Sequence, residues 1–165
     1  MKYSKITLVL AAISSFIFIF SSCGKSKCQP VELDENFKCH ADITQGEITY
    51  SADLERADGA GWKAVFTAPK TIEGMELSLF NDSCTLNFKE LSYTASREDL
   101  PQFGIIDLVT SALDECAKRQ DLECIKDGES VTQNGKIKDL DFKVEFKEKK
   151  LSSLEITNEL TAKFS

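Results

Sequence analysis

FKCHADITQGEITYSADL, residues 37–54, alternates apolar and polar side chains on both sides of a short turn. Alternation with period two is typical of a strand with one buried face, and the turn at Gln45-Gly46 joins two such strands. We therefore predict an antiparallel hairpin that begins the folded domain. Its apolar positions are Phe37, Cys39, Ala41 and Ile43 in the first strand and Ile48, Tyr50, Ala52 and Leu54 in the second.

The same alternation continues toward the C-terminus as far as residue 88. Short turns separate the segments, so each predicted strand pairs with the one before it and the five strands form a meander. The apolar positions are Trp62, Ala64 and Phe66 in the third strand, Met75, Leu77 and Leu79 in the fourth, and Cys84, Leu86 and Phe88 in the fifth.

Residues 97–118 show helical periodicity instead. Asp99 is suited to cap this helix and Pro101 to its first turn. Because the helix is apolar on one side only, it must pack against the sheet. The apolar stripe consists of Ile105, Leu108, Val109, Ala112, Leu113 and Cys116.

Alternation returns after the helix. Weak strand signals at 124–125 and 130–137 are interrupted by Gly128 and Gly135, whereas 140–146, 154–156 and 160–164 are clearer. The sequence therefore predicts an α+β domain of eight or nine antiparallel strands with one helix inserted after the fifth.

The N-terminal pattern predicts an export signal. Lys2 and Lys5 precede the apolar run 6–20, and two serines then stand directly before Cys23. This arrangement resembles the lipobox of bacterial lipoproteins, which implies that Cys23 is diacylated and becomes the first residue of the mature protein. An uncleaved anchor and a freely secreted form are the alternatives. In all three cases the rest of the chain is extracytoplasmic, and we expect it to be anchored to the cell membrane by lipid.

Three regions follow from these patterns: a signal peptide at 1–22, a polar, flexible tether at 23–36 and a folded domain at 37–165. The 27 acidic residues outnumber the 20 basic ones and give a net charge of −7. An acidic domain argues against nucleic acid as a partner, because phosphate binding needs clustered Lys and Arg. Surplus acid otherwise keeps an exported domain soluble.

Six cysteines occur, and five are left for pairing if Cys23 is lipidated. Five cysteines allow many pairings; among them Cys116 and Cys124 are the most plausible disulfide because they flank a predicted turn. Cys39 and Cys84 lie in strand patterns, where a buried thiol is common. With one histidine and no CxxC motif, a zinc site or a thioredoxin-type redox centre is not expected.

Catalytic patterns are missing from the sequence. His40, the one histidine, lies on the polar side of a strand, where a solvated role is expected. The acidic pairs at 114–115 and 127–129 lack the alternating oxygen ligands of a calcium loop and favour solvated turns or helix ends. We expect neither enzyme activity nor a metal or cofactor.

The order of elements resembles the outer-membrane lipoprotein carrier superfamily (LolA/LolB-like). The resemblance lies in the first hairpin, in the segments 62–69 and 72–74, and in the ending 154–164, and it covers roughly residues 37–165. It implies a curved antiparallel sheet, a half-barrel of about 8–11 strands, with one long helix packed on its concave face. Small lipid-anchored proteins of Gram-positive bacteria share this order of elements and look closer than the true carriers.

The carriers' activity does not follow from the resemblance. They move acyl chains in a cavity with the help of particular arginines, and none of Arg56, Arg97 and Arg119 matches such a position. A membrane-tethered protein is also not a soluble shuttle, although a tethered ligand holder fits the pattern.

One predicted sheet face carries bulky apolar side chains. Such a face is either a core that the helix covers or, where the helix is too narrow, an apolar groove for a lipid or acyl chain. A lipid-anchored binding protein is therefore the first functional hypothesis, and an interaction lipoprotein that contacts an envelope protein without a small ligand is the alternative. The candidate ligand-binding residues are Trp62, Phe66, Met75, Leu77, Leu86, Phe88, Phe142 and Val144.

Overall fold

The computed structural model describes residues 26–34, 36–57, 61–99, 104–119 and 121–165. The predicted signal peptide, the lipidation site Cys23 and the helix-start residue Pro101 lie outside the described residues.

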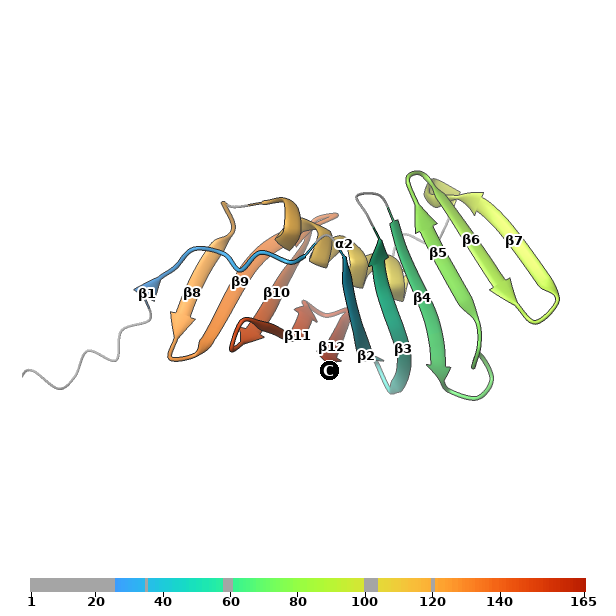
Figure 1. Cartoon of the computed structure of the whole chain (residues 1–165), viewed down its shortest axis with the longest axis horizontal. Helices are drawn as coiled ribbons and strands as arrows, with labels where there is room; N and C mark the ends of the chain where they lie inside the picture. The colour runs from blue at the N-terminus through green and yellow to red at the C-terminus, as the bar shows by residue number, and fades with distance from the viewer. Residues whose placement is uncertain (1–25, 35, 58–60, 100–103, 120) are drawn as a thin grey trace, which may run out of the picture.

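The described chain forms one open antiparallel sheet of twelve strands in the order β1-β8-β9-β10-β11-β12-β2-β3-β4-β5-β6-β7 (Figure 1). The C-terminal strand β12 pairs with β2, so that the two halves of the chain share one sheet. The first half consists of β1 (Ser26–Lys27), β2 (Phe37–Gln45), β3 (Ile48–Ala57), β4 (Gly61–Ala68), β5 (Glu76–Phe80), β6 (Ser83–Phe88) and β7 (Leu91–Ser96). The second consists of β8 (Glu123–Asp127), β9 (Ser130–Ile137), β10 (Leu140–Lys147), β11 (Lys150–Ile156) and β12 (Leu160–Phe164).

The predicted alternation of buried and exposed side chains is confirmed in the middle of the sheet. In the β2–β3 hairpin Ala41 lies opposite Ala52, and Cys39 lies opposite Leu54. Ala41, Ala52 and Leu54 are at most 1% exposed, whereas Asp42 and Asp53 between them face solvent. One face of the sheet is therefore core, and we call it the helix-side face because the helix packs there.

Helix α2 (Ile105–Lys118) supplies the other side of the core. It begins at Ile105, later than a cap at Asp99 predicts, and Arg97–Asp99 form a separate 3-10 turn, η2. Its first residue follows Gly104 without a side-chain cap, so the predicted capping role of Asp99 is wrong. In Figure 1 α2 lies across the middle of the sheet, and β6 and β7 extend beyond it.

Gly135, which weakened the strand prediction, has a packing role in β9. It lies opposite Phe142 of β10, and a Cβ at this position would meet the Phe142 ring at 2.5 Å. The aromatic ring thus covers the glycine, and the strand continues through it.

The segment that the sequence analysis assigns to the tether is attached to the domain where the structure describes it. Ser26 and Lys27 pair with β8, and Val31 and Leu33 pack against the core. Gln133 donates a hydrogen bond to the carbonyl oxygen of Val31 (3.2 Å). The contacts fix the chain along the sheet before the first long strand begins.

The predicted Cys116–Cys124 disulfide is wrong. Cys124 forms a disulfide with Cys28, at a sequence separation of 96, and Cys116 is a free, buried thiol on α2. The apolar stripe turns Cys116 toward the core, whereas Cys124 on β8 lies beside the N-terminal segment, with the Cys28 amide donating to the Cys124 carbonyl (3.3 Å).

Candidate functional site

Half of the predicted ligand-binding residues belong to the filled core. Trp62, Phe66, Phe142 and Val144 are between 0% and 5% exposed and pack in one cluster with α2. The helix places four fully buried side chains against this part of the face. They are Leu108, Val109, Ala112 and Leu113. This region has no open groove for a ligand, because the helix fills it.

The other half of the predicted set lies at the β5–β7 end, where cover is incomplete. Cross-strand partners share a face, so the row Ala64, Leu77, Leu86, Tyr93 runs along the helix-side face from β4 to β7. Exposure rises along this row from 1% at Ala64 to 65% at Tyr93. Met75, Leu77, Leu86 and Phe88 are partly buried.

Leu91 completes this region. It lies opposite Phe88 in the β6–β7 hairpin and is 74% exposed. We call the set Leu77, Leu86, Phe88, Leu91 and Tyr93 the open patch. Sequence reasoning missed Leu91 and Tyr93 because it assigned no strand to 91–96, although their spacing and the two-residue turn before them were a signal.

A buried carboxylate ties α2 to both halves of the sheet. Asp107 is 5% exposed and accepts a hydrogen bond (2.6 Å) from Nε of Arg97, the residue that follows β7. Lys138, in the β9–β10 turn, binds the other carboxylate oxygen. Two cations from opposite sides thus neutralise the buried Asp107 carboxylate. Burial of this charge without a partner would be strongly unfavourable.

A second carboxylate, Asp114, holds the next turn of the helix. It accepts hydrogen bonds from Trp62 Nε1 (3.0 Å) and Arg56 Nε (3.1 Å), and the Arg56 guanidinium lies 6.0 Å from the centre of the Trp62 ring. The sequence pattern at 114–115 favours a solvated acidic pair. In the structure the Asp114 side chain is partly enclosed by its partners and has a structural role.

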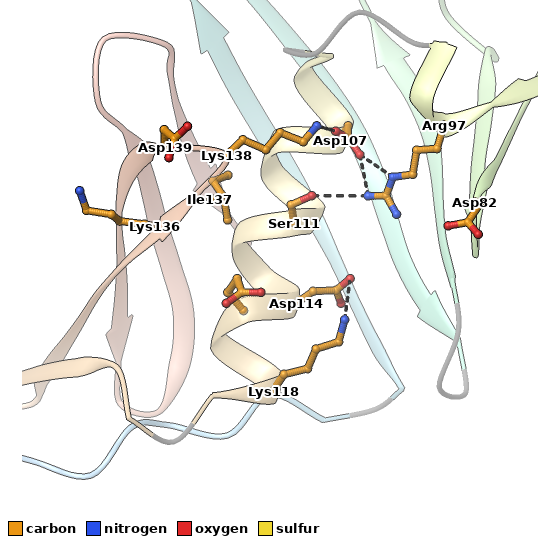
Figure 2. Close-up of a pocket in the computed structure, with 11 residues that line it drawn as sticks. Asp82, Arg97, Asp107, Ser111, Asp114, Lys118, Lys136, Ile137, Lys138 and Asp139 are labelled. Carbon is orange, nitrogen blue, oxygen red and sulfur yellow. Dashed lines mark hydrogen bonds and ion pairs between the residues drawn. The ribbon is translucent and has the colours of Figure 1, made fainter.

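These groups line a polar cleft on the outer side of α2, with a volume of about 850 Å³ (Figure 2). The helix forms its floor, the β9–β10 turn one wall, and Asp82 with Arg97 the other. Charges of both signs pair across the cleft, as they do at Arg97, Asp107 and Lys138. Such a lining separates the apolar core from solvent and suits no acyl chain.

The three free thiols in the part of the chain that the structure describes all have raised pKa values. Burial, with a smaller contribution from the charge of Glu115, raises the pKa of Cys116 to about 12. Burial, then the charge of Asp53, raises the pKa of Cys39 to about 12. The pKa of Cys84 is also raised, chiefly by burial. Thiols with raised pKa values are poor nucleophiles, because the reactive form is the thiolate.

His40 lies on the half-exposed outer side of β2, where its Nδ1 is 2.7 Å from an Asp53 carboxylate oxygen. No Ser or Cys nucleophile is among its described polar partners. Within the described ranges no group of three His, Cys, Asp or Glu side chains is arranged to hold a metal ion. The helices in that part of the chain are too short or too polar to cross a membrane.

No protein-family profile matches the sequence, and no curated protein does. Among solved structures, a LolA superfamily protein from Nitrosomonas europaea is similar at 8% identity and a TM-score of 0.40, over 82% of this chain and 86% of that one.

Proposed function

We propose that this protein is a lipid-anchored extracytoplasmic binding protein that takes an apolar or amphipathic ligand, such as an acyl chain, on the open patch. The observation that carries the proposal is the contiguous apolar surface of β5–β7, on which Leu91 and Tyr93 are 74% and 65% exposed. Single exposed apolar residues are ordinary on protein surfaces, whereas a contiguous patch is typical of a binding surface.

The proposed ligand site contains only part of the set of residues predicted from the sequence. Trp62, Phe66, Phe142 and Val144 are occupied by packing against α2 and are not part of the proposal. Leu77, Leu86 and Phe88 offer partly buried walls, and Leu91 and Tyr93 offer the exposed rim. Partly buried walls beside an exposed rim suit a flexible acyl chain that lies against the patch on one side and leaves its polar end in water.

Anchoring rests on the leader sequence, whose lysines, apolar run and Cys23 resemble a lipoprotein signal. The first described strand, β1, pairs with β8 at one edge of the sheet, and β7 forms the other edge. Eleven strand spacings of about 4.8 Å separate them by roughly 50 Å along the sheet. The anchor would therefore leave the open patch at the far end of the domain.

Native mass spectrometry with organic extraction tests the ligand proposal. The chain expressed from Gly24 onward contains every described element, and it should carry or take up a fatty acid whose mass is lost on extraction. Phe88→Asp should abolish uptake, because a charge in the patch repels an acyl chain. Phe80→Asp is the matched control, since Phe80 is 55% exposed on the opposite face. Uptake unchanged in Phe88→Asp, or none in the unsubstituted chain, would overturn the proposal.

A second candidate is an interaction lipoprotein that contacts another protein without a small ligand. The edge strand β7 favours it, because its six residues carry no charge. This candidate predicts an apo mass in the experiment above, together with a protein complex that depends on β7.

A further inference from the structure

Strand β7 is a sheet edge whose outward backbone groups can be assigned. It pairs with β6 on one side and is last in the strand order. The Arg97 amide donates to the Asp82 carbonyl (2.7 Å), which continues the β6–β7 ladder. Hydrogen-bonded and non-bonded pairs alternate in antiparallel ladders, so Leu91, Tyr93 and Ala95 bond to β6. The backbone groups of Ser92 and Thr94 therefore face away from β6, toward the open edge.

Three of the devices that block a sheet edge, namely charge, proline and a bulge, are missing from the described residues of this strand. Residues 91–96, LSYTAS, contain no charge and no proline, and the β6–β7 pairing is regular without a bulge. Natural sheets protect their edges with just these features. The side chains of Ser92 and Thr94 are engaged within the hairpin, by Asn87 at 2.7 Å and Thr85 at 3.0 Å, so they do not obstruct approach to the edge.

We propose that β7 is a homodimer interface, at which a second copy of this chain adds its own β7 antiparallel across a two-fold axis through Ser92. Ser92 then bonds to the partner's Ser92, and Leu91 lies opposite the partner's Tyr93 on the helix-side face. The interface shares Leu91 and Tyr93 with the open patch. Its backbone pairing is tested without added ligand, so a failure of the dimer is distinguishable from a failure of ligand binding.

The charge pattern selects this register from its neighbours. With the axis at Ser92, Glu90 lies opposite the partner's Thr94 and Lys89 opposite the partner's Ala95, so no like charges meet. A shift that places Tyr93 opposite the partner's Tyr93 aligns the turn residue Lys89 with the partner's Arg97, whose charge Asp107 already pairs, so this register is disfavoured less strongly. A shift to an axis at Thr94 places Leu91 opposite that arginine. Opposed like charges and an apolar side chain opposite a charge both disfavour pairing.

The two-fold register also explains why a second copy fits better than an arbitrary peptide. Leu91 of each copy lies beside the partner's Tyr93, and the two-fold axis repeats this pair. The open patch therefore continues across both molecules. Strand-edge pairing of this size buries less than the roughly 1,200 Å² that stable complexes need, so the dimer should form reversibly with concentration. Both copies are acidic, with a charge of −7 for the whole chain, so screening by salt should strengthen the dimer.

Cysteine cross-linking in the chain from Gly24 onward tests the register. In Ser92→Cys the two introduced thiols lie on directly opposed residues, whose Cα atoms are about 5.5 Å apart, within disulfide range. In the matched variant Thr94→Cys they are offset by four residues, or about 13 Å, and cannot be bridged. Mild oxidation should therefore yield covalent dimer from Ser92→Cys only, against the unsubstituted chain as background for the native thiols.

Sedimentation equilibrium supplies the second readout. Thr94→Pro removes an outward amide that β6 does not use, so it should raise the dimer dissociation constant at least tenfold while the circular dichroism spectrum is kept. Raising NaCl from 20 to 500 mM should increase the dimer fraction of the unsubstituted chain. A monomer at every concentration, equal cross-linking of both cysteine variants, or an unsubstituted chain that pairs only with another protein through β7 would overturn the proposal.

Discussion

The middle of the sheet and its β5–β7 end share one sequence pattern but differ in the burial of their apolar side chains. Ala41, Leu54, Trp62 and Val144 in the middle are at most 4% exposed, whereas Tyr93 at the end is 65% exposed. Alternation predicts which side chains share a face, but the burial of that face depends on what lies over it. The contrast shows that an amphipathic strand is evidence for a face and not for a filled core.

Helix length explains where the cover ends. Fourteen residues at about 1.5 Å each make α2 about 21 Å long. Strands spaced by about 4.8 Å place the outer strands of this sheet roughly 50 Å apart. A helix that lies across the strands therefore covers the middle and leaves an end (Figure 1).

The sharpest stability contrast compares one leucine from each region. Leu113→Ala, at a position that is 0% exposed, should lower the free energy of unfolding by about 3–4 kcal/mol through lost burial and a cavity. Leu91→Ala, at 74% exposure, should change it by less than about 0.5 kcal/mol. Urea unfolding of both variants measures the contrast, and similar losses at the two positions would remove the distinction between the regions.

Asp107 links the two regions, because Arg97 follows β7 and Lys138 belongs to the β9–β10 turn. Asp107→Ala should cost about 1.5–3 kcal/mol, since it removes charge-assisted hydrogen bonds to Arg97 and Lys138, whose partly exposed side chains water can solvate. Lys138→Met should cost less, because Arg97 still neutralises the carboxylate. Equal stability of Asp107→Ala and the unsubstituted protein in urea would mean that solvent satisfies both cations.

Gly135→Ala probes packing at the opposite end of the filled region. The new methyl group would meet the Phe142 ring at 2.5 Å and Leu122 at 2.9 Å, so we expect a loss of about 1–3 kcal/mol from overpacking. Gly128→Ala is a control without crowding, although its φ of 61° adds a smaller backbone cost. Thermal unfolding should rank Gly135→Ala below Gly128→Ala.

Alkaline pH should affect the filled region through Cys116. Its pKa is raised to about 12, whereas the thiol of the unfolded chain titrates near 9, so the folded state keeps a proton that the unfolded state loses. Stability is therefore fully present below pH 9 and falls as the pH rises toward 12, by about 1.4 kcal/mol per pH unit from this group. Cys116→Ala should reduce the decline between pH 9 and 10 without abolishing it, because the pKa of Cys39 is also raised to about 12. An unchanged slope would contradict the assignment.

Sequence reasoning predicted what local periodicity determines. The hairpin 37–54, the apolar face and the helical stripe followed from alternation and from 3.6-residue spacing. It missed β7 although residues 91–96 alternate apolar and polar side chains, because it ended the meander at residue 88. It missed the Cys28–Cys124 disulfide because many pairings of distant cysteines are possible. The Asp107 contacts join residues 10 and 31 positions away through the fold, which no local pattern encodes.

Paramagnetic broadening of amide NMR signals by a spin-labelled fatty acid tests most directly whether ligand access is confined to β5–β7. We predict broadening at Leu86, Phe88 and Tyr93, with the Val144 and Leu154 signals of the filled region unaffected. Broadening centred on Val144 and Leu154, or none at β5–β7 at saturating fatty acid, would contradict this account.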